Sequence, residues 1–198
     1  KNEFYLTLMG HAKWYLGMRI RQYKNSILLD QDQYVKNITA CFKKMFKHSF
    51  KLKDSPLPGN FVPTKNDCPK NEAQTKEVKL RFGNLHYRSV IGALLYVSCC
   101  TRPDISYAVN KLAKYSNNPG IIHFRALLHL IGYLKGTSQK GIRFYRYMKD
   151  SPVDTLLRQN NIESNPNSIL TFTDSSWNNC IDTRRSTGGY ITYIHGGA

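Results

Sequence analysis

The alternation of apolar and polar residues predicts a β-hairpin near the start of the chain. Between Lys13 and Arg21 the pattern is typical of a strand with one apolar and one basic face. The apolar face comprises Trp14, Leu16, Met18 and Ile20, and the other face comprises Tyr15, Gly17, Arg19 and Arg21. Lys24-Asn25-Ser26 then provides a turn. The apolar run Ile27-Leu28-Leu29 predicts a second strand that pairs with the first.

From Gln31 the period changes, and an apolar stripe predicts a helix to about Phe46, with Asp30 or Asp32 as its cap. The stripe comprises Tyr34, Ile38, Cys41, Phe42 and Met45. Residues 47–78 hold four of the eight prolines, so we expect no regular element there. This stretch is interpreted as a surface excursion or as a linker between two packed units.

Three helices are predicted between residues 84 and 136. The first covers residues 84–99, and the third ends at Gly136. The second starts at Thr101-Arg102-Pro103-Asp104, which combines a capping residue, a first-turn proline and an acidic side chain near the helix N-terminus. Apolar residues at helical spacing give each helix an inner face, so the three together predict a small bundle.

Two glycines lie inside these helices in similar settings, Ile91-Gly92 and Ile131-Gly132. Glycine in a helix interior costs about 1 kcal/mol relative to alanine. We therefore expect a neighbouring helix or backbone to approach closely at both positions.

The last third of the chain returns to strand patterns. A strand is predicted at Ile142–Tyr147 and a short helix near Val153–Gln159. Two further strands, Ile169–Asp174 and Tyr190–Ile194, are joined by a turn rich in Ser, Asn and Arg. The pattern as a whole predicts an α+β fold.

The charge of the chain favours a polyanionic partner. The 198 residues carry 29 Lys and Arg against 13 Asp and Glu, a formal net charge of +16. Residues 101–150 hold nine basic and two acidic residues, whereas residues 151–198 hold three and four. Nucleic acid is favoured over a membrane surface, because no basic amphipathic helix with Trp or Phe on its other face stands out. A surface that merely keeps the protein soluble is the alternative explanation.

Several other classes of protein are disfavoured. No apolar run approaches the roughly 20 residues that span a bilayer, and we expect no secretory signal segment. The five cysteines include no Cys-x-x-Cys pair, which argues against a disulfide framework or a zinc knuckle and fits a reducing compartment. The six histidines show no His-x-x-x-His spacing, and neither a Gly-x-Ser-x-Gly elbow nor a phosphate-binding glycine loop occurs.

The polar face of the second predicted helix is a candidate for contact with nucleic acid. Tyr107, Lys111 and Lys114 fall opposite its apolar stripe, with Tyr115 beside them. Lysine neutralises phosphate while tyrosine packs on sugar or base. For this stripe alone, an ordinary solvated helix face is the favoured explanation. The neighbouring helices add Arg88, Arg125 and Lys135, which shifts the balance toward binding.

One acidic residue stands out. Asp174 ends an apolar strand with Leu170 and Phe172 on the same face, where a carboxylate is costly to bury without a partner. Taken by itself, an aspartate in this position is more often a cap or a turn residue.

Four motifs occur in order along the chain. They are Phe4–Gly10 with Trp14–Ile20, Tyr87–Tyr96 with Thr101–Ile105, His123 with Tyr133–Thr137, and Thr173–Trp177 with Asp182–Tyr190. Together they resemble the Ty1/copia class of retrotransposon polyproteins, from the end of the reverse transcriptase into the ribonuclease H domain. The resemblance covers nearly the whole chain except the proline-rich connection and residues 148–168.

The resemblance implies an order of domains. The end of a polymerase palm with a primer-grip-like hairpin (1–47) is followed by a proline-rich connection (48–80), a three-helix thumb (81–140), a tether (141–168) and the truncated start of a ribonuclease H-like sheet (169–198). The primer grip would hold the primer terminus through Trp14, Leu16, Gly17 and Met18. The thumb would follow the backbone of the template–primer duplex without reading its sequence, through Arg88, Tyr107, Lys111, Lys114, Arg125 and Lys135.

The resemblance also implies a metal ligand. Asp174 would be the first catalytic carboxylate of ribonuclease H and a ligand of Mg²⁺, whereas Asp182 matches no catalytic acid and is expected in a turn. The polymerase signature Tyr-x-Asp-Asp and the later acidic ligands of ribonuclease H are absent from the 198 residues. We therefore expect a fragment that grips the duplex, does not bind Mg²⁺ tightly and is non-catalytic in isolation.

The expected partners are an RNA–DNA hybrid or a DNA duplex and the rest of the polyprotein, with neither a membrane nor a small-molecule substrate. The resemblance implies a cytoplasmic location in a virus-like particle, or a nuclear one. A non-catalytic nucleic-acid-binding remnant of a degenerate or domesticated element is the alternative function. A third hypothesis is a decayed reading frame whose product does not fold stably.

Overall fold

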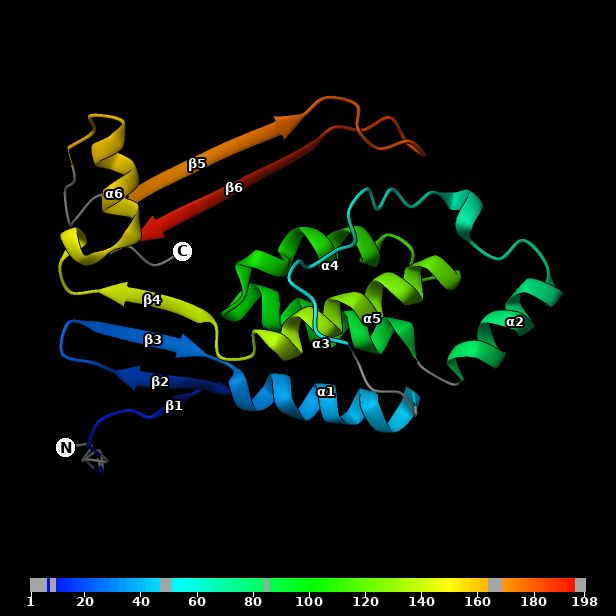
Figure 1. The fold of residues 1–198 in the computed structure, drawn as a ribbon, viewed down its shortest axis with the longest axis horizontal. Coiled ribbons are helices and arrows are strands. Elements are labelled where there is room, and N and C mark those ends of the chain that lie inside the picture. Colours follow the sequence, from blue (N-terminus) through cyan, green and yellow to red (C-terminus); the bar gives the residue numbers. More distant parts are fainter. Residues whose placement is uncertain (1–6, 8–9, 47–50, 84–85, 164–168, 195–198) are drawn as a thin grey trace, which may run out of the picture.

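Helices and two antiparallel sheets form a mixed α+β fold in the computed structural model, which describes residues 7, 10–46, 51–83, 86–163 and 169–194. In Figure 1 the four-stranded sheet lies at one end of the helical body, and a two-stranded hairpin extends along another side of it. The α+β class predicted from the residue pattern is confirmed.

The larger sheet contains β1 (Trp14–Tyr15), β2 (Met18–Gln22), β3 (Ser26–Asp30) and β4 (Gly141–Tyr145), in that order and all antiparallel. In the register, Leu29 lies opposite Ile20 on one side and Ile142 on the other. Part of the stretch interpreted as a tether is therefore a strand of this sheet, which fastens the end of the helical region to the hairpin.

The prediction of one continuous strand from Lys13 to Arg21 was wrong. The chain turns at Leu16 and Gly17, whose φ angles are +46° and +76°. A two-residue turn with positive φ at both central positions matches the twist of a hairpin, and glycine adopts this conformation without strain. Because of the turn, Trp14 lies opposite Arg19 instead of extending its strand, so the apolar face of the predicted strand is split in two.

Four helices enclose the core: α1 (Asp32–Phe46), α3 (Tyr87–Cys100), α4 (Ser106–Ala113) and α5 (Ile121–Gly136). Between α3 and α4 a short 3₁₀ turn, η2, covers Pro103–Ile105. The predicted helices are thus confirmed, and their inner faces include the fully buried Leu94, Leu112, Leu127, Leu130 and Leu134. No helix in the described ranges is both long enough and apolar enough to cross a membrane.

The proline-rich connection is more regular than predicted. It contains the 3₁₀ turn η1 (Lys65–Asp67) and the helix α2 (Glu72–Phe82). The side chain of Asn71 caps α2 by accepting a hydrogen bond from the Gln74 amide at 2.9 Å. The spacing of apolar residues did not predict α2, because this helix buries only Val78 and carries no apolar stripe. The capping residues are the sequence feature that marks it.

The two helical glycines have opposite environments. A Cβ atom on Gly132 would lie 2.3 Å from the carbonyl oxygen of Lys51, so the connection passes directly over α5 at this point. The expected close approach is therefore confirmed at Gly132, by backbone. At Gly92 a Cβ atom would meet nothing within 4 Å, so the same expectation was wrong there.

The last elements are the 3₁₀ turn η3 (Met148–Asp150), the helix α6 (Pro152–Gln159) and the strands β5 (Ile169–Ser176) and β6 (Thr187–Ile194). The short helix and both strands were predicted, although each strand is longer than expected. Leu170 and Tyr193 pack against Val153 and Leu157 of α6 in a small second core. The two-stranded sheet is therefore anchored at its α6 end, while its loop extends toward the helices (Figure 1).

Candidate nucleic-acid interface

The polar face of α4 brings together three of the predicted contact residues. Tyr107, Lys111 and Lys114 line one hollow of about 90 Å³. The Lys111 ammonium donates to the Tyr107 hydroxyl at 3.1 Å and lies 5.2 Å from the centre of that ring. It is also 6.0 Å from the centre of the Phe61 ring, so Lys111 is half-buried between two aromatic side chains. Tyr107 and Lys114 remain exposed.

An ion pair between a buried arginine and a partly exposed aspartate connects the start of α4 to the end of α5. Arg102 is 1% exposed, and its Nε and Nη2 donate to the two carboxylate oxygens of Asp104 at 2.9 and 2.8 Å. Nη1 and Nη2 also donate to the carbonyl oxygen and the hydroxyl of Thr137, both at 2.7 Å. The start of α4 is therefore bound to the end of α5.

The Asp104 carboxylate is held charged. The Tyr133 hydroxyl donates to its Oδ2 at 2.7 Å. Burial alone would raise the pKa of Asp104, but the hydrogen bonds from Arg102 and Tyr133 outweigh burial and lower that pKa below its usual range. The Thr101-Arg102-Pro103-Asp104 motif thus forms a charged connection between two helices. The predicted capping role of Thr101 was wrong, because its hydroxyl donates to the Gln31 side chain at 2.8 Å and neither η2 nor α4 has a side-chain cap.

The remaining predicted cations are exposed but do not line the hollow of the α4 cluster. Arg88 donates to the Asn117 side chain at 3.3 Å and lines a different hollow, of about 660 Å³, at the N-terminus of α3. Arg125 and Lys135 are ten residues apart on α5, which corresponds to about 15 Å along the helix axis. The predicted track is therefore a cluster of three residues with separate cations around it.

The predicted primer-grip residues lie together at the β1–β2 turn. Trp14 is 55% exposed and Leu16 is 71% exposed, so the turn presents apolar surface to solvent. The Tyr96 hydroxyl of α3 donates to the Leu16 carbonyl at 2.7 Å. A Cβ atom on Gly17 would lie 2.9 Å from that hydroxyl, so glycine is required here by contact as well as by φ. The turn is thereby fixed on the helical body.

Asp174 is exposed on β5, directly opposite Gly189 of β6. Leu170 and Phe172 share its face, as predicted from the alternation, and α6 covers only the Leu170 end of that face. Among the described residues, no three His, Cys, Asp or Glu side chains are grouped closely enough to hold a metal ion. The role of Asp174 as a Mg²⁺ ligand stays a prediction.

The residue that sequence reasoning undervalued is Asp182. It lies in the β5–β6 loop, where a turn role was expected, but its two carboxylate oxygens each accept from the Lys65 backbone amide at 3.0 Å. The Tyr115 hydroxyl lies 3.2 Å from Asp182 Oδ2. Asp182 therefore joins the loop of the second sheet to the proline-rich connection, across more than a hundred residues of sequence. No local sequence pattern predicts such a contact.

A buried, neutral histidine packs against Tyr115, the residue whose hydroxyl lies beside Asp182. His123 is fully buried and stacks on Tyr115 with ring centres 4.1 Å apart. The Gly120 amide donates to its Nδ1 at 2.9 Å, which requires the imidazole to accept at that nitrogen. Burial lowers the pKa of His123 to about 4, against the smaller opposing effects of Asp67 and Asp182.

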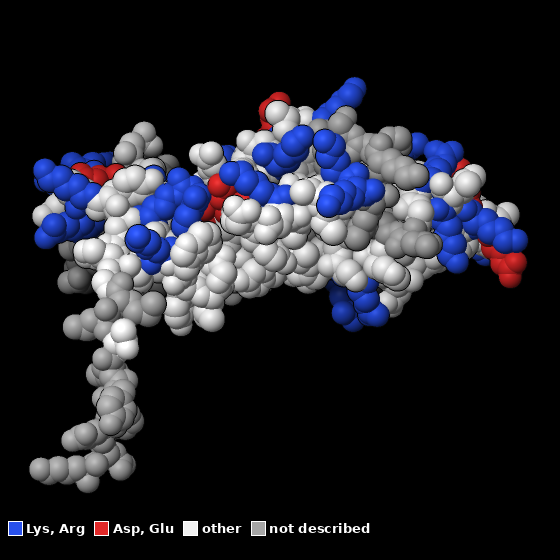
Figure 2. All heavy atoms as spheres, turned by 90° about the horizontal axis from the view of Figure 1, so that it is seen from below, with Lys and Arg blue, Asp and Glu red and all other residues white. Residues whose placement is uncertain are grey.

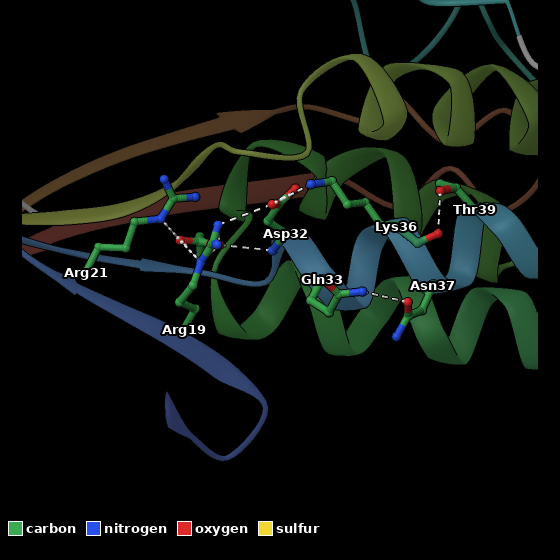
Figure 3. A network of polar contacts seen from close by, with 8 residues as sticks. Arg19, Arg21, Asp32, Gln33, Lys36, Asn37 and Thr39 are labelled. Atoms are coloured by element: carbon green, nitrogen blue, oxygen red, sulfur yellow. Dashed lines mark hydrogen bonds and ion pairs between the residues drawn. The ribbon is translucent and has the colours of Figure 1, made fainter. Parts of the chain in front are cut away.

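The basic face of the first hairpin is used internally. Arg19 Nη2 and Arg21 Nε pair with the fully buried Asp30 at 3.0 and 2.8 Å. Arg19 also reaches Asp32, which pairs with Lys36 at 2.8 Å on the first turn of α1 (Figure 3). Asp30 Oδ1 accepts the Asp32 amide at 3.1 Å, so the expected helix cap is confirmed in Asp30. These arginines are therefore committed to the fold.

Positive charge nevertheless dominates the surface near α1. Figure 2 views the molecule from below, the side on which α1 lies, and shows Lys and Arg atoms from one end to the other with few Asp and Glu atoms. The exposed lysines of α1 are Lys36, Lys43 and Lys44. The basic surface is thus wider than the α4 cluster.

Comparison with known proteins gives a consistent class. The chain is 30% identical over 198 residues to the Retrovirus-related Pol polyprotein from transposon TNT 1-94 of Nicotiana tabacum, covering 99% of the chain and 13% of the polyprotein. It is 35% identical over 108 residues to the Pol polyprotein from transposon RE2 of Arabidopsis thaliana, covering 54% of the chain and 6% of that protein. An uncharacterized mitochondrial protein of Arabidopsis thaliana is 27% identical over 98% of the chain and 67% of its own length.

The homologues of the chain are Ty1/copia-type retrotransposon Pol polyproteins and mitochondrial transposon-related proteins, and together they match most of the chain, as the motifs predicted. The chain spans only a small part of the length of the Pol polyproteins that it matches. No family model matches the chain. No solved structure matches it.

Proposed function

We propose that the chain is the part of a retrotransposon Pol polyprotein in which the reverse transcriptase ends and ribonuclease H begins, and that it grips the template–primer duplex. The observation that carries this proposal is the single hollow that Tyr107, Lys111 and Lys114 line together on the polar face of α4. The fold supports it, because the core helices share one hydrophobic cluster.

The physical argument concerns phosphate. A duplex carries closely spaced negative charges along its backbone, and each lysine that neutralises a phosphate releases a condensed counterion. Lys111 and Lys114 are three residues apart, so they project from one side of the helix. The partner is an RNA–DNA hybrid or a DNA duplex, and contacts of this kind position the duplex without reading its sequence.

In the same proposal, the sheet β1–β4 is the end of the polymerase palm and the helices α3 to α5 form the thumb. The β1–β2 turn is the primer grip, and its apolar tip, with Trp14 and Leu16 exposed, offers a surface on which a base or sugar packs. Its attachment to Tyr96 supports this role, because the turn is fixed relative to the helices that bear the lysines.

The hairpin β5–β6 is, in this proposal, the beginning of ribonuclease H, with Asp174 as its first Mg²⁺ ligand. In two-metal sites, the bound ions stabilise the attacking and leaving oxygens of the phosphate. Residues 1–198 alone are expected to bind a duplex without cleaving or extending it. In the whole polyprotein, Asp174→Asn should abolish cleavage of the RNA strand of a hybrid while DNA synthesis continues.

A direct test measures binding of a 20-base-pair RNA–DNA hybrid to the 198-residue chain at several salt concentrations. The logarithm of the association constant falls linearly with the logarithm of the salt concentration. Replacing Lys111 and Lys114 by Ala should make this negative slope shallower by about 2, close to one unit per lost phosphate contact. The matched control replaces Lys76 and Lys79, which have the same spacing and lie exposed on α2. Equal effects of the two pairs would remove the α4 face from the interface.

A second candidate function is a nucleic-acid-binding remnant outside any active polyprotein. One observation favours it: the match covers 67% of the mitochondrial relative but only 13% of the tobacco Pol polyprotein, so the same region also occurs in a protein far shorter than a Pol polyprotein. The DNA that flanks the coding sequence separates the two. An open frame with Tyr-x-Asp-Asp upstream favours the polyprotein, and its absence favours the remnant.

A further inference from the structure

The loop between β5 and β6, residues 177–186, lies against the face of α4 that carries the lysines. Asn179, Cys180 and Ile181 of this loop line the same hollow as Tyr107, Lys111 and Lys114. Hydrogen bonds from Thr183, and to a lesser extent the charge of Lys114, lower the pKa of the Cys180 thiol. The loop and the α4 cluster therefore form one continuous surface.

Two arginines sit in this loop. Arg184 and Arg185 are exposed, and they are the only Lys or Arg residues after Arg158. The Arg184 amide donates to the Cys180 carbonyl at 2.7 Å, and the Cys180 amide donates to the Arg185 carbonyl at 3.2 Å. Both arginines are thus joined through the backbone to a residue that lines the hollow. The two cations of a segment with net negative charge are thus adjacent to each other in the loop that lines this hollow.

Asp182 fixes the loop in this position. Its carboxylate accepts from the Lys65 amide at 3.0 Å and lies 3.2 Å from the Tyr115 hydroxyl. Tyr115 also donates to the Pro63 carbonyl at 2.7 Å and stacks on the buried His123. The loop is therefore attached to the core of the helical body, although α6 packs only against the opposite end of the two-stranded sheet.

We infer that the β5–β6 loop is a second part of the polyanion-binding surface, and that Asp182 is a positioning residue that holds Arg184 and Arg185 beside the lysines of α4. The inference rests on the proposed function. It adds that the duplex contacts two parts of the fold at once, the helical body and the second sheet.

The sign of one substitution separates this inference from simple electrostatics. Asp182→Ala removes a negative charge, which by charge alone should tighten binding of a polyanion. If Asp182 positions the arginines, the same change releases the loop and weakens binding. The control is Glu163→Ala, which makes the same change in net charge at an exposed position after α6. Expected results are weaker hybrid binding for Asp182→Ala and unchanged or tighter binding for Glu163→Ala.

The arginines themselves are tested with the same 20-base-pair hybrid. Replacing Arg184 and Arg185 by Ala should lower the salt slope by about 2. The advantage of the wild type over this variant should then shrink by about tenfold between 50 and 200 mM salt. In the Asp182→Ala background, the double arginine replacement should add little, because the loop is already released. An unchanged slope, or full additivity with Asp182→Ala, would overturn the inference.

A measurement without nucleic acid checks the attachment. Hydrogen exchange at the Lys65 amide should be slow in the wild type and in Glu163→Ala, and fast in Asp182→Ala. Tyr115→Phe removes one hydroxyl without changing charge and should give an intermediate loss of hybrid binding. If the wild type does not bind the hybrid at all, the proposed function fails. If it binds and the loop variants behave like Glu163→Ala, only the present inference fails.

Discussion

Removal of the Arg102 guanidinium should be among the most damaging single changes in the helical body. Arg102 is buried, and it makes hydrogen bonds to both carboxylate oxygens of Asp104 and to two oxygens of Thr137. Arg102→Ala leaves Asp104 with the Tyr133 hydroxyl as its hydrogen-bonding side chain and deprives the Thr137 carbonyl of a donor.

The expected cost follows from general magnitudes. Breaking a buried ion pair by removing one partner costs about 3–5 kcal/mol. The Asp104 side chain is 36% exposed, so water screens part of its charge and the lower end, about 3 kcal/mol, is the better expectation. For a chain of this size, that loss corresponds to a fall in Tm of about 6–12 °C. Arg102→Lys keeps the positive charge but loses the planar guanidinium with its paired donors, so its Tm should lie between those of the wild type and Arg102→Ala.

The assay is thermal unfolding followed by circular dichroism, with Arg81→Ala as the control. Arg81 pairs with Glu77 at 2.8 Å, the same distance as Arg102 Nη2 to Asp104, but both side chains are nearly half exposed. An exposed pair contributes less than about 1 kcal/mol. If Arg102→Ala shifted Tm no more than Arg81→Ala, burial would not be what gives this contact its strength.

The pH dependence gives a second test of the same contact. The pKa of Asp104 is lowered in the folded state, so its charge stabilises the fold above the ordinary value of 3.8, and this contribution disappears as pH falls through the folded pKa. The difference in stability between wild type and Arg102→Ala should therefore shrink in acid. A constant difference down to pH 2 would assign the loss to packing alone.

Three other changes have definite expected signs. Gly92→Ala should stabilise the chain by about 0.5–1 kcal/mol in thermal unfolding, because the added methyl group meets open space in α3. Gly132→Ala should destabilise it in the same assay, because its Cβ would lie 2.3 Å from the Lys51 carbonyl, and equal effects at the two sites would contradict the contact. Between pH 6.5 and 4, His123 is protonated in the unfolded chain but stays neutral in the folded one. The free energy of unfolding should therefore fall by roughly 3 kcal/mol as the pH drops through that range. His123→Asn should flatten the denaturation curve in this window, and a variant with the wild-type slope would refute the assignment.

The residue pattern predicted most of the elements and fewer of the contacts between them. The helices α1, α3, α4 and α5 were predictable because each buries one apolar stripe. The helix α2 was not, since it buries only Val78 and is defined by its caps. The turn at Leu16 and Gly17 was missed because the apolar alternation continues through it, whereas the backbone reverses. A period records which residues face the core and does not record where the chain turns.

The candidate site shows the same division. The common face of Tyr107, Lys111 and Lys114 follows directly from helical spacing, and the hollow that they share is what such spacing predicts. Asp182 could not be assigned in this way, because its partner at Lys65 is a backbone amide 117 residues distant. A backbone donor leaves no trace in the side-chain pattern, so a contact of this kind is found only in three dimensions.

Two of the segments that carry the family resemblance hold helices together, and they do not contain the α4 residues proposed to contact the duplex. A single hydrogen-bond network joins the start of α4 to the end of α5. One motif contributes Arg102 and Asp104 to it, and another contributes Tyr133 and Thr137. The residues proposed to touch the duplex on α4 lie between these motifs and outside them. The contacts between the motifs hold the start of α4, whereas its polar face takes no part in them. A substitution at Arg102 should consequently lower both stability and duplex binding, whereas substitutions at Lys111 should lower binding alone.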